Sequence, residues 1–92
     1  MTSGRASGMT HAERSHTRLR LAERYGLDVS SADVFQMAKR IAHGQATLVT
    51  RQSRHVAHWQ LDYQGQSLLL VFDRQRRSII TALPPLTEEP AP

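Results

Sequence analysis

The sequence predicts an α+β domain in which two N-terminal helices precede a four-stranded antiparallel β-meander. Up to Gly44, apolar residues recur at the 3.6-residue spacing of helices, and after it they alternate with the two-residue period of strands. The strand-like segments are joined by short connections, which favour antiparallel pairing between neighbours in sequence. A chain of 92 residues allows one domain, which we expect over residues 11–85.

The first helix is expected over residues 11–25, after a Gly- and Ser-rich leader, residues 1–10, that we expect to be flexible. Gly26 supplies its C-terminal stop. One side of this helix is apolar and is expected to face the core, and it carries Leu19, Leu21, Ala22 and Tyr25. The polar side has the helical spacing i, i+4, i+7 and i+8, and it carries His16, Arg20, Glu23 and Arg24.

The second helix is expected over residues 30–43. Ser30 is suited to the N-cap, and Asp33 favours the positive end of the helix dipole. Gly44 stands at the C-terminal stop, directly after a last turn that is rich in cations. The apolar stripe that should face the core consists of Val34, Met37, Ala38 and Ile41.

Four strands are expected after Gly44, over residues 46–52, 55–63, 67–72 and 78–83. The unbroken apolar run Leu68–Phe72 predicts a central strand. Pro84-Pro85 ends the last strand, and the Pro- and Glu-rich tail, residues 86–92, is expected to be disordered. One sheet face should carry the helices, with Trp59 and Phe72 in the core. The other face is partly polar, so it offers a surface to a partner.

The composition favours a polyanionic partner. The chain has twelve Arg and Lys against eight Asp and Glu, and eleven of the twelve bases are Arg. Arg forms planar bidentate contacts with phosphate, so RNA or a nucleoprotein complex is the expected partner. The alternative is a basic domain with no nucleic-acid role. The absence of Cys excludes disulfides and thiolate metal sites, and the spacing of the five His predicts no metal site and no cofactor.

No apolar run approaches the roughly 20 residues that a membrane span needs, and the first residues contain no apolar stretch typical of a signal peptide. We therefore expect no membrane association and a cytoplasmic location.

Two segments of the chain resemble small uncharacterised bacterial domains that are grouped with the RelE-like toxins. His16-Thr17-Arg18-Leu19-Arg20-Leu21-Ala22-Glu23-Arg24 is similar to their H-A-x-x-R-M-x-E-R helix, with Thr17 in place of Ala and Leu21 in place of Met. Residues 70–73 and 79–84 are similar to their last hairpin. The resemblance covers residues 11–85. It implies a RelE-like fold, a metal-independent endoribonuclease toxin and an acidic antitoxin as partner.

The resemblance also implies roles for the polar side of the first helix. A metal-independent ribonuclease needs an acid and a base for proton transfer, and cations around the phosphate. His16 suits the first task, Arg20 and Arg24 suit the second, and Glu23 is a further candidate base. The alternative is a solvated helix surface on which Arg20 pairs with Glu23 at i, i+3.

A second group of candidates is expected to bind nucleic acid. It comprises residues of the strands and of a basic turn, namely Arg51, Arg54, His58, Arg74, Arg76 and Arg77. The alternative for His58 is a polar cross-strand face, and for the turn a solvated hairpin tip.

A rival function is open as well. Many RelE-like toxins carry a C-terminal catalytic Tyr or His, and residues 86–92 contain neither. That difference favours a non-enzymatic phage or mobile-element protein that binds and inhibits a host nucleoprotein complex.

Overall fold

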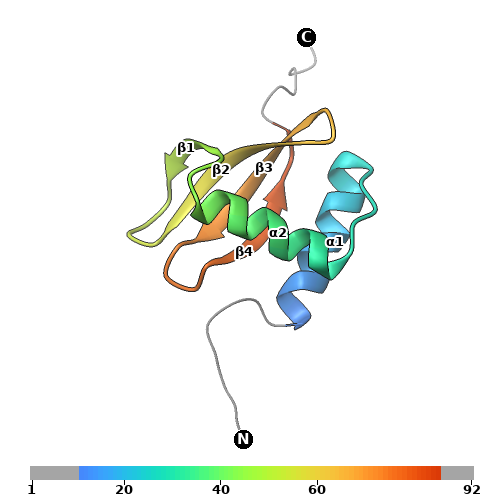
Figure 1. The fold of residues 1–92 in the computed structure, drawn as a ribbon, viewed down its shortest axis with the longest axis horizontal. Coiled ribbons are helices and arrows are strands. Elements are labelled where there is room, and N and C mark those ends of the chain that lie inside the picture. Colours follow the sequence, from blue (N-terminus) through green and yellow to red (C-terminus); the bar gives the residue numbers. More distant parts are fainter. Residues whose placement is uncertain (1–10, 86–92) are drawn as a thin grey trace, which may run out of the picture.

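The computed structural model describes residues 11–85, with side chains from Arg14 onward, so the expectations for residues 1–10 and 86–92 lie outside the described residues. Two helices, α1 (His11–Tyr25) and α2 (Ser31–Ala42), precede four strands (Figure 1). The strands are β1 (Thr47–Arg51), β2 (Val56–Tyr63), β3 (Gln66–Asp73) and β4 (Ser78–Leu83). They form one antiparallel sheet in the order β1-β2-β3-β4. The predicted two-helix, four-strand meander is confirmed.

The start of α2 is held by a reciprocal cap. The Ser30 hydroxyl accepts from the Asp33 backbone N–H at 3.1 Å, and the Asp33 carboxylate accepts from the Ser30 N–H at 2.9 Å. These two backbone groups have no partner within the helix, so the cap satisfies both of them. The hydrogen bond from the Ser30 backbone, and then that from its side chain, lower the pKa of Asp33 below 3.8. Ser30 is therefore the N-cap, as predicted.

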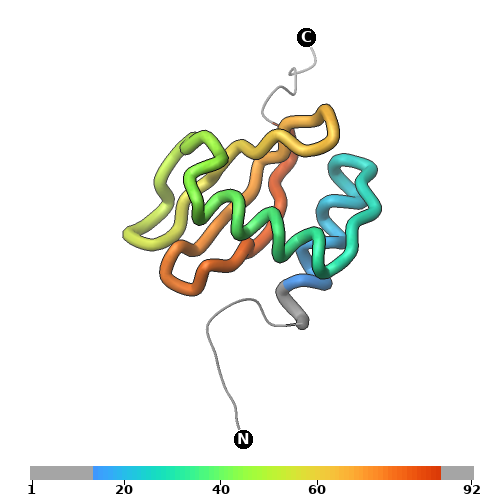
Figure 2. Tube along the Cα trace, viewed as in Figure 1, coloured from blue at the N-terminus to red at the C-terminus, as the bar shows by residue number. Residues whose placement is uncertain are grey.

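The core lies between the sheet and the two helices. α2 crosses one face of the sheet, and α1 packs beside β4 (Figures 1 and 2). Leu68, Leu70 and Phe72 alternate along β3 and belong to this core, with Leu70 fully buried. The core also contains the whole predicted stripe of α2. β3 lies between β2 and β4, so the run Leu68–Phe72 is a central strand, as predicted.

The face of the sheet that points away from α2 is called the open face below. It carries the alternate residues of β2 and β3, because successive side chains of a strand point to opposite faces. Leu69 and Val71 lie at its centre and are only 6% and 5% exposed. Their cross-strand neighbours are Gln60 and Leu83 for Leu69, and His58 and Thr81 for Val71. These neighbours flank the two apolar residues on both sides.

The predicted apolar side of α1 is wrong in part. Leu21 is buried and Tyr25 packs against the core, but Leu19 is 51% exposed and Ala22 is also exposed. Thr17, by contrast, is fully buried, and its hydroxyl donates to the Ile79 carbonyl at 3.4 Å. α1 packs along an edge strand whose outward carbonyls need donors, so a small hydroxyl residue suits the contact.

Tyr25 fastens the end of α1 to the last two strands. Its hydroxyl donates to the Leu83 carbonyl at 2.6 Å and accepts from the Leu69 N–H at 2.9 Å. Leu69 and Leu83 are direct cross-strand partners, so the hydroxyl bridges β3 and β4.

No helix among the described residues is long and apolar enough to cross a bilayer.

Candidate nucleic-acid interface

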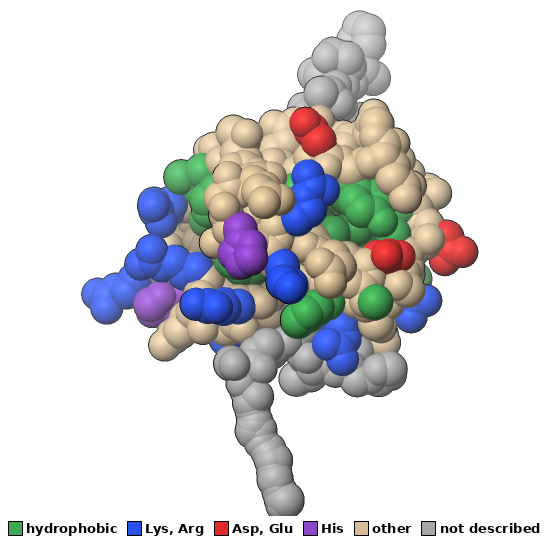
Figure 3. Space-filling view, viewed as in Figure 1, with side chains coloured by type: hydrophobic (Ala, Val, Ile, Leu, Met, Phe, Trp, Pro, Cys, Tyr) green, Lys and Arg blue, Asp and Glu red, His purple; other side chains and the backbone are tan. Residues whose placement is uncertain are grey.

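Two basic connections lie at the same end of the sheet. In an antiparallel meander the β1–β2 and β3–β4 connections share one end, and here the Arg74 N–H donates to the His55 carbonyl at 2.8 Å. The structure thereby brings together five of the six predicted nucleic-acid-binding residues, which we call the basic end: Arg51, Arg54, Arg74, Arg76 and Arg77. Figure 3 shows Lys and Arg side chains gathered at this side of the molecule.

All five arginines of the basic end are exposed. Within residues 14–85, the side chains of Arg51, Arg54 and Arg74 form no ion pair with a carboxylate. Asp73, the carboxylate nearest in sequence, accepts from the backbone N–H groups of Gln75 at 2.9 Å and Arg76 at 3.2 Å. It therefore shapes the turn that presents the arginines. The positive charges of Arg51, Arg54 and Arg74 are therefore available to a polyanion.

Arg77 closes the β3–β4 turn with a φ of 55°. This left-handed conformation is uncommon for a residue with a side chain and is more often occupied by Gly, Asn or Asp. The turn therefore carries a cation at a position where a small or short polar residue would fit the backbone better.

His58, the sixth candidate, lies on the open face next to the basic end. Its Nε2 is 3.0 Å from Oε1 of Gln52, and its strand neighbour is Val71. This is the polar cross-strand arrangement that the sequence left open as an alternative, and it leaves the imidazole half-buried with one nitrogen engaged.

The four candidates on α1 are not gathered around one point. Arg20 and Glu23 bind each other, with 2.7 Å between Nη1 and Oε1 and side chains 34% and 48% exposed. Arg24 is half-buried, and its charge acts on the neighbouring Tyr25 hydroxyl. His16 is exposed, and its Nε2 lies 3.1 Å from the Thr81 hydroxyl of β4. The Arg20–Glu23 pair anticipated as the alternative is therefore present.

The sheet register relates two histidines that the sequence treated separately. His58 pairs with Val71, and Val71 pairs with Thr81, so these three residues form one row on the open face. His16 contacts Thr81 at the edge of that row. Two strand spacings, or about 10 Å, separate the backbones of His58 and Thr81. Polar groups able to transfer protons thus lie on both sides of Val71.

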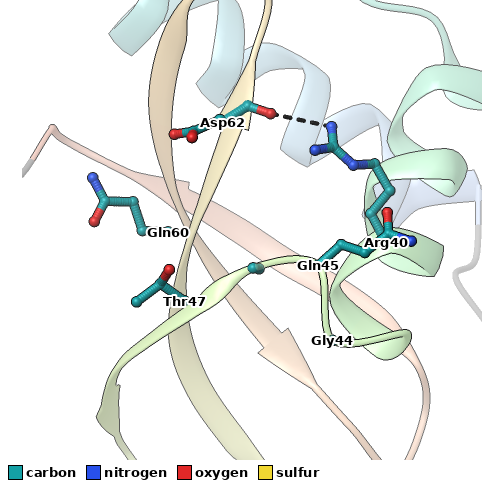
Figure 4. A pocket seen from close by; sticks show the side chains of 7 residues that line it. Arg40, Gly44, Gln45, Thr47, Gln60 and Asp62 are labelled. Atoms are coloured by element: carbon teal, nitrogen blue, oxygen red, sulfur yellow. Dashed lines mark hydrogen bonds between the residues drawn. The ribbon is translucent and has the colours of Figure 1, made fainter.

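Sequence reasoning missed a polar cavity of about 460 Å³ where β1 begins and β2 ends. Its lining includes residues from the last turn of α2, from the connection and from both strands (Figure 4), namely Arg40, Gly44, Gln45, Thr47, Gln60 and Asp62. Arg40 donates to the Asp62 backbone carbonyl at 3.1 Å, which ties α2 to β2. The sequence signal was the polar alternation Gln60–Asp62 on β2, which does not reveal the facing Thr47.

Within residues 14–85, no three His, Asp or Glu side chains lie close enough together to hold a metal ion.

Searches against family models, curated proteins and solved structures find no match to the chain. The RelE-like assignment therefore stays a prediction that rests on the two segments quoted above.

Proposed function

We propose that this chain is an RNA-binding domain of the RelE-like type that grips the phosphate backbone at its basic end. The observation that carries the proposal is the convergence of Arg51 and Arg54 with the Arg74–Arg77 turn, fastened by the Arg74–His55 hydrogen bond. The guanidinium groups of Arg51, Arg54 and Arg74 form no ion pair with a carboxylate within residues 14–85, and they are suited to phosphate oxygens because Arg binds these through two parallel N–H donors.

The open face gives a bound strand a route away from the basic end. On this face the row His58–Val71–Thr81 has a polar residue on each side of Val71, with His16 at its edge. Single-stranded RNA suits this surface better than a duplex, because its phosphates and base edges can follow a shallow face. An acidic antitoxin segment would compete for the same arginines, and an RNA target is consistent with a cytoplasmic location.

The binding proposal is tested by the salt dependence of affinity for a single-stranded RNA. Each phosphate contact that is lost should reduce the slope of log K against log salt by about 0.7. We expect Arg54→Gln to reduce the slope and weaken binding. Arg18→Gln is the matched control, since it removes the same charge from a side chain that binds the Val29 carbonyl at 2.7 Å, away from the basic end. If Arg54→Gln and Arg18→Gln change the affinity and the salt slope equally, binding depends on net charge alone and the proposed phosphate contact at the basic end is contradicted.

Metal-independent cleavage is a second candidate function, favoured by the position of His16 beside Thr81 and in line with His58. In this reaction one imidazole takes the proton of the 2′-hydroxyl, whose oxygen attacks phosphorus. The bond from phosphorus to the 5′-oxygen breaks, and the leaving oxygen takes a proton from the second imidazole. We assign His16 to one of these roles and His58 to the other.

Cleavage is tested with purified protein in the presence of chelator. We expect His16→Ala to reduce the rate by roughly 10²–10⁴-fold while RNA affinity changes little, because proton transfer by one positioned side chain contributes about that much. His43→Ala is the matched control, because it removes the same side chain from an exposed position at the end of α2, outside both groups of candidate residues. RNA binding without cleavage in the unmodified protein would exclude the ribonuclease and favour the inhibitor of a host nucleoprotein complex.

A further inference from the structure

The polar cavity at the start of β1 has an internal arrangement that suits one kind of ligand. Thr47 and Gln60 are direct cross-strand partners, and Asp62 follows Gln60 on the same face of β2. In Figure 4 the Asp62 carboxylate and the side chains of Gln60 and Thr47 lie on one side of β2, whereas Arg40 approaches from the other. Three different hydrogen-bonding groups therefore line one wall.

The hydrogen bonds already present leave specific atoms of this wall available. Oδ1 of Asp62 accepts from the Ser67 hydroxyl at 3.1 Å, and Arg40 is directed to the Asp62 backbone carbonyl. The second carboxylate oxygen, both ends of the Gln60 carboxamide and the Thr47 hydroxyl have no hydrogen-bond partner among residues 14–85. The wall thus offers an anionic acceptor beside a neutral donor.

This combination disfavours phosphate and favours a guanine base. A carboxylate repels a phosphate, so the wall formed by Asp62, Gln60 and Thr47 is poorly suited to a second backbone grip. On its Watson–Crick edge, guanine has two adjacent N–H donors beside the O6 acceptor. A carboxylate can accept from those donors while a carboxamide N–H donates to O6. Adenine presents an acceptor where guanine presents its ring N–H, so the carboxylate would face a lone pair.

The cavity is also reachable from the basic end. Thr47 and Arg51 are the two ends of β1, four residues apart, which corresponds to about 13 Å along the strand. Gln60 lies on the same face as His58, one row farther from the basic end. A single strand whose phosphates lie on the arginines can therefore extend a base to this cavity.

We propose that this cavity binds a guanine base of the single-stranded RNA held at the basic end, with Asp62 and Gln60 as the residues that select it. The inference rests on the proposed RNA-binding function, which it refines by assigning a base preference. Arg40 positions Asp62 through its backbone and makes no base contact in this arrangement.

The test compares the affinities of two fluorescent oligouridylates, one with a single guanosine and the other with adenosine at the same place. We expect the unmodified protein to prefer the guanosine strand about fivefold or more, the lower end of what a bidentate base contact contributes. Asp62→Asn should abolish that preference while the salt dependence of binding to plain oligouridylate is unchanged. Asp28→Asn, which changes an exposed carboxylate outside the cavity, should retain the preference.

Three results would overturn this inference while leaving RNA binding intact. The first is equal affinity of the unmodified protein for the two strands, and the second is a guanosine preference that survives both Asp62→Asn and Gln60→Leu. Guanosine monophosphate that competes as well as the guanosine strand would reassign the cavity to free nucleotides and would also overturn it. Failure of the proposed RNA-binding function would give a different result. In that case neither strand would bind, or Arg54→Gln would not change the affinity for either strand.

Discussion

The hydroxyl of Tyr25 allows a single-atom test of how α1 is attached to the sheet. Tyr25→Phe keeps the ring that packs against the core and removes the group that bridges the Leu69 N–H and the Leu83 carbonyl. Each hydrogen bond contributes about 0.5–1.5 kcal/mol, so the two together predict a loss of about 1–3 kcal/mol in the free energy of unfolding. For a domain of this size, each kcal/mol corresponds to about 4–8 °C in Tm.

Urea unfolding followed by circular dichroism measures this loss, with Tyr63→Phe as the matched control. Tyr63 also packs against the core, but its hydroxyl forms no hydrogen bond within residues 14–85, so its removal should change little. A Tyr25→Phe protein as stable as Tyr63→Phe would refute the bridging role of the hydroxyl.

The stability lost in Tyr25→Phe should also depend on pH. Burial raises the pKa of Tyr25 above 10.0, although the Leu69 hydrogen bond and the Arg24 charge oppose the shift. A raised pKa in the folded state means that the stability contributed by the protonated hydroxyl is complete below pH 10.0 and is lost as pH rises through the folded pKa. The stability gap between the unmodified protein and Tyr25→Phe should therefore be constant up to about pH 10 and narrow above it. If the stability difference between the two proteins stays constant as the pH rises above 10, the protonated Tyr25 hydroxyl is not its source.

The remaining predictions concern the core and the cap of α2. Leu70→Ala should cost about 2–5 kcal/mol by leaving a cavity in the central strand, whereas Leu19→Ala should change stability by less than about 0.5 kcal/mol because Leu19 is half-exposed; equal denaturation midpoints for the two variants would contradict the burial described above. Ser30→Ala should cost about 0.5–2 kcal/mol through loss of the N-cap, measured by the same unfolding assay. The lowered pKa of Asp33 adds stability above pH 3.8 that is lost as pH falls through the folded pKa, so a thermal-unfolding series in acid should show a smaller decline for Asp33→Asn, which has no carboxylate to titrate, than for the unmodified protein; parallel declines would argue against the capping carboxylate as the source of the acid sensitivity.

The order and type of the six elements were readable from the sequence, because the signals for them are local. The change of apolar period at Gly44 separates helices from strands within a few residues. Ser30 and Asp33 lie within one turn, so their reciprocal cap follows from their spacing. The run that contains Leu70 likewise identifies the central strand by its own composition.

Only the tertiary structure decided which side of α1 is buried and which polar residues share a surface. Hydrophobicity favoured Leu19 over Thr17 as a core residue, but the edge of β4 presents a carbonyl that a hydroxyl can satisfy. The alignment of His16 with His58 depends on strand register and on helix docking, which are contacts between residues far apart in the chain. The pairing of Thr47 with Gln60 at the polar cavity depends on register as well, which here includes a bulge in β1. Local periodicity specifies which face of a strand a residue occupies, but not which residue of the neighbouring strand lies opposite it.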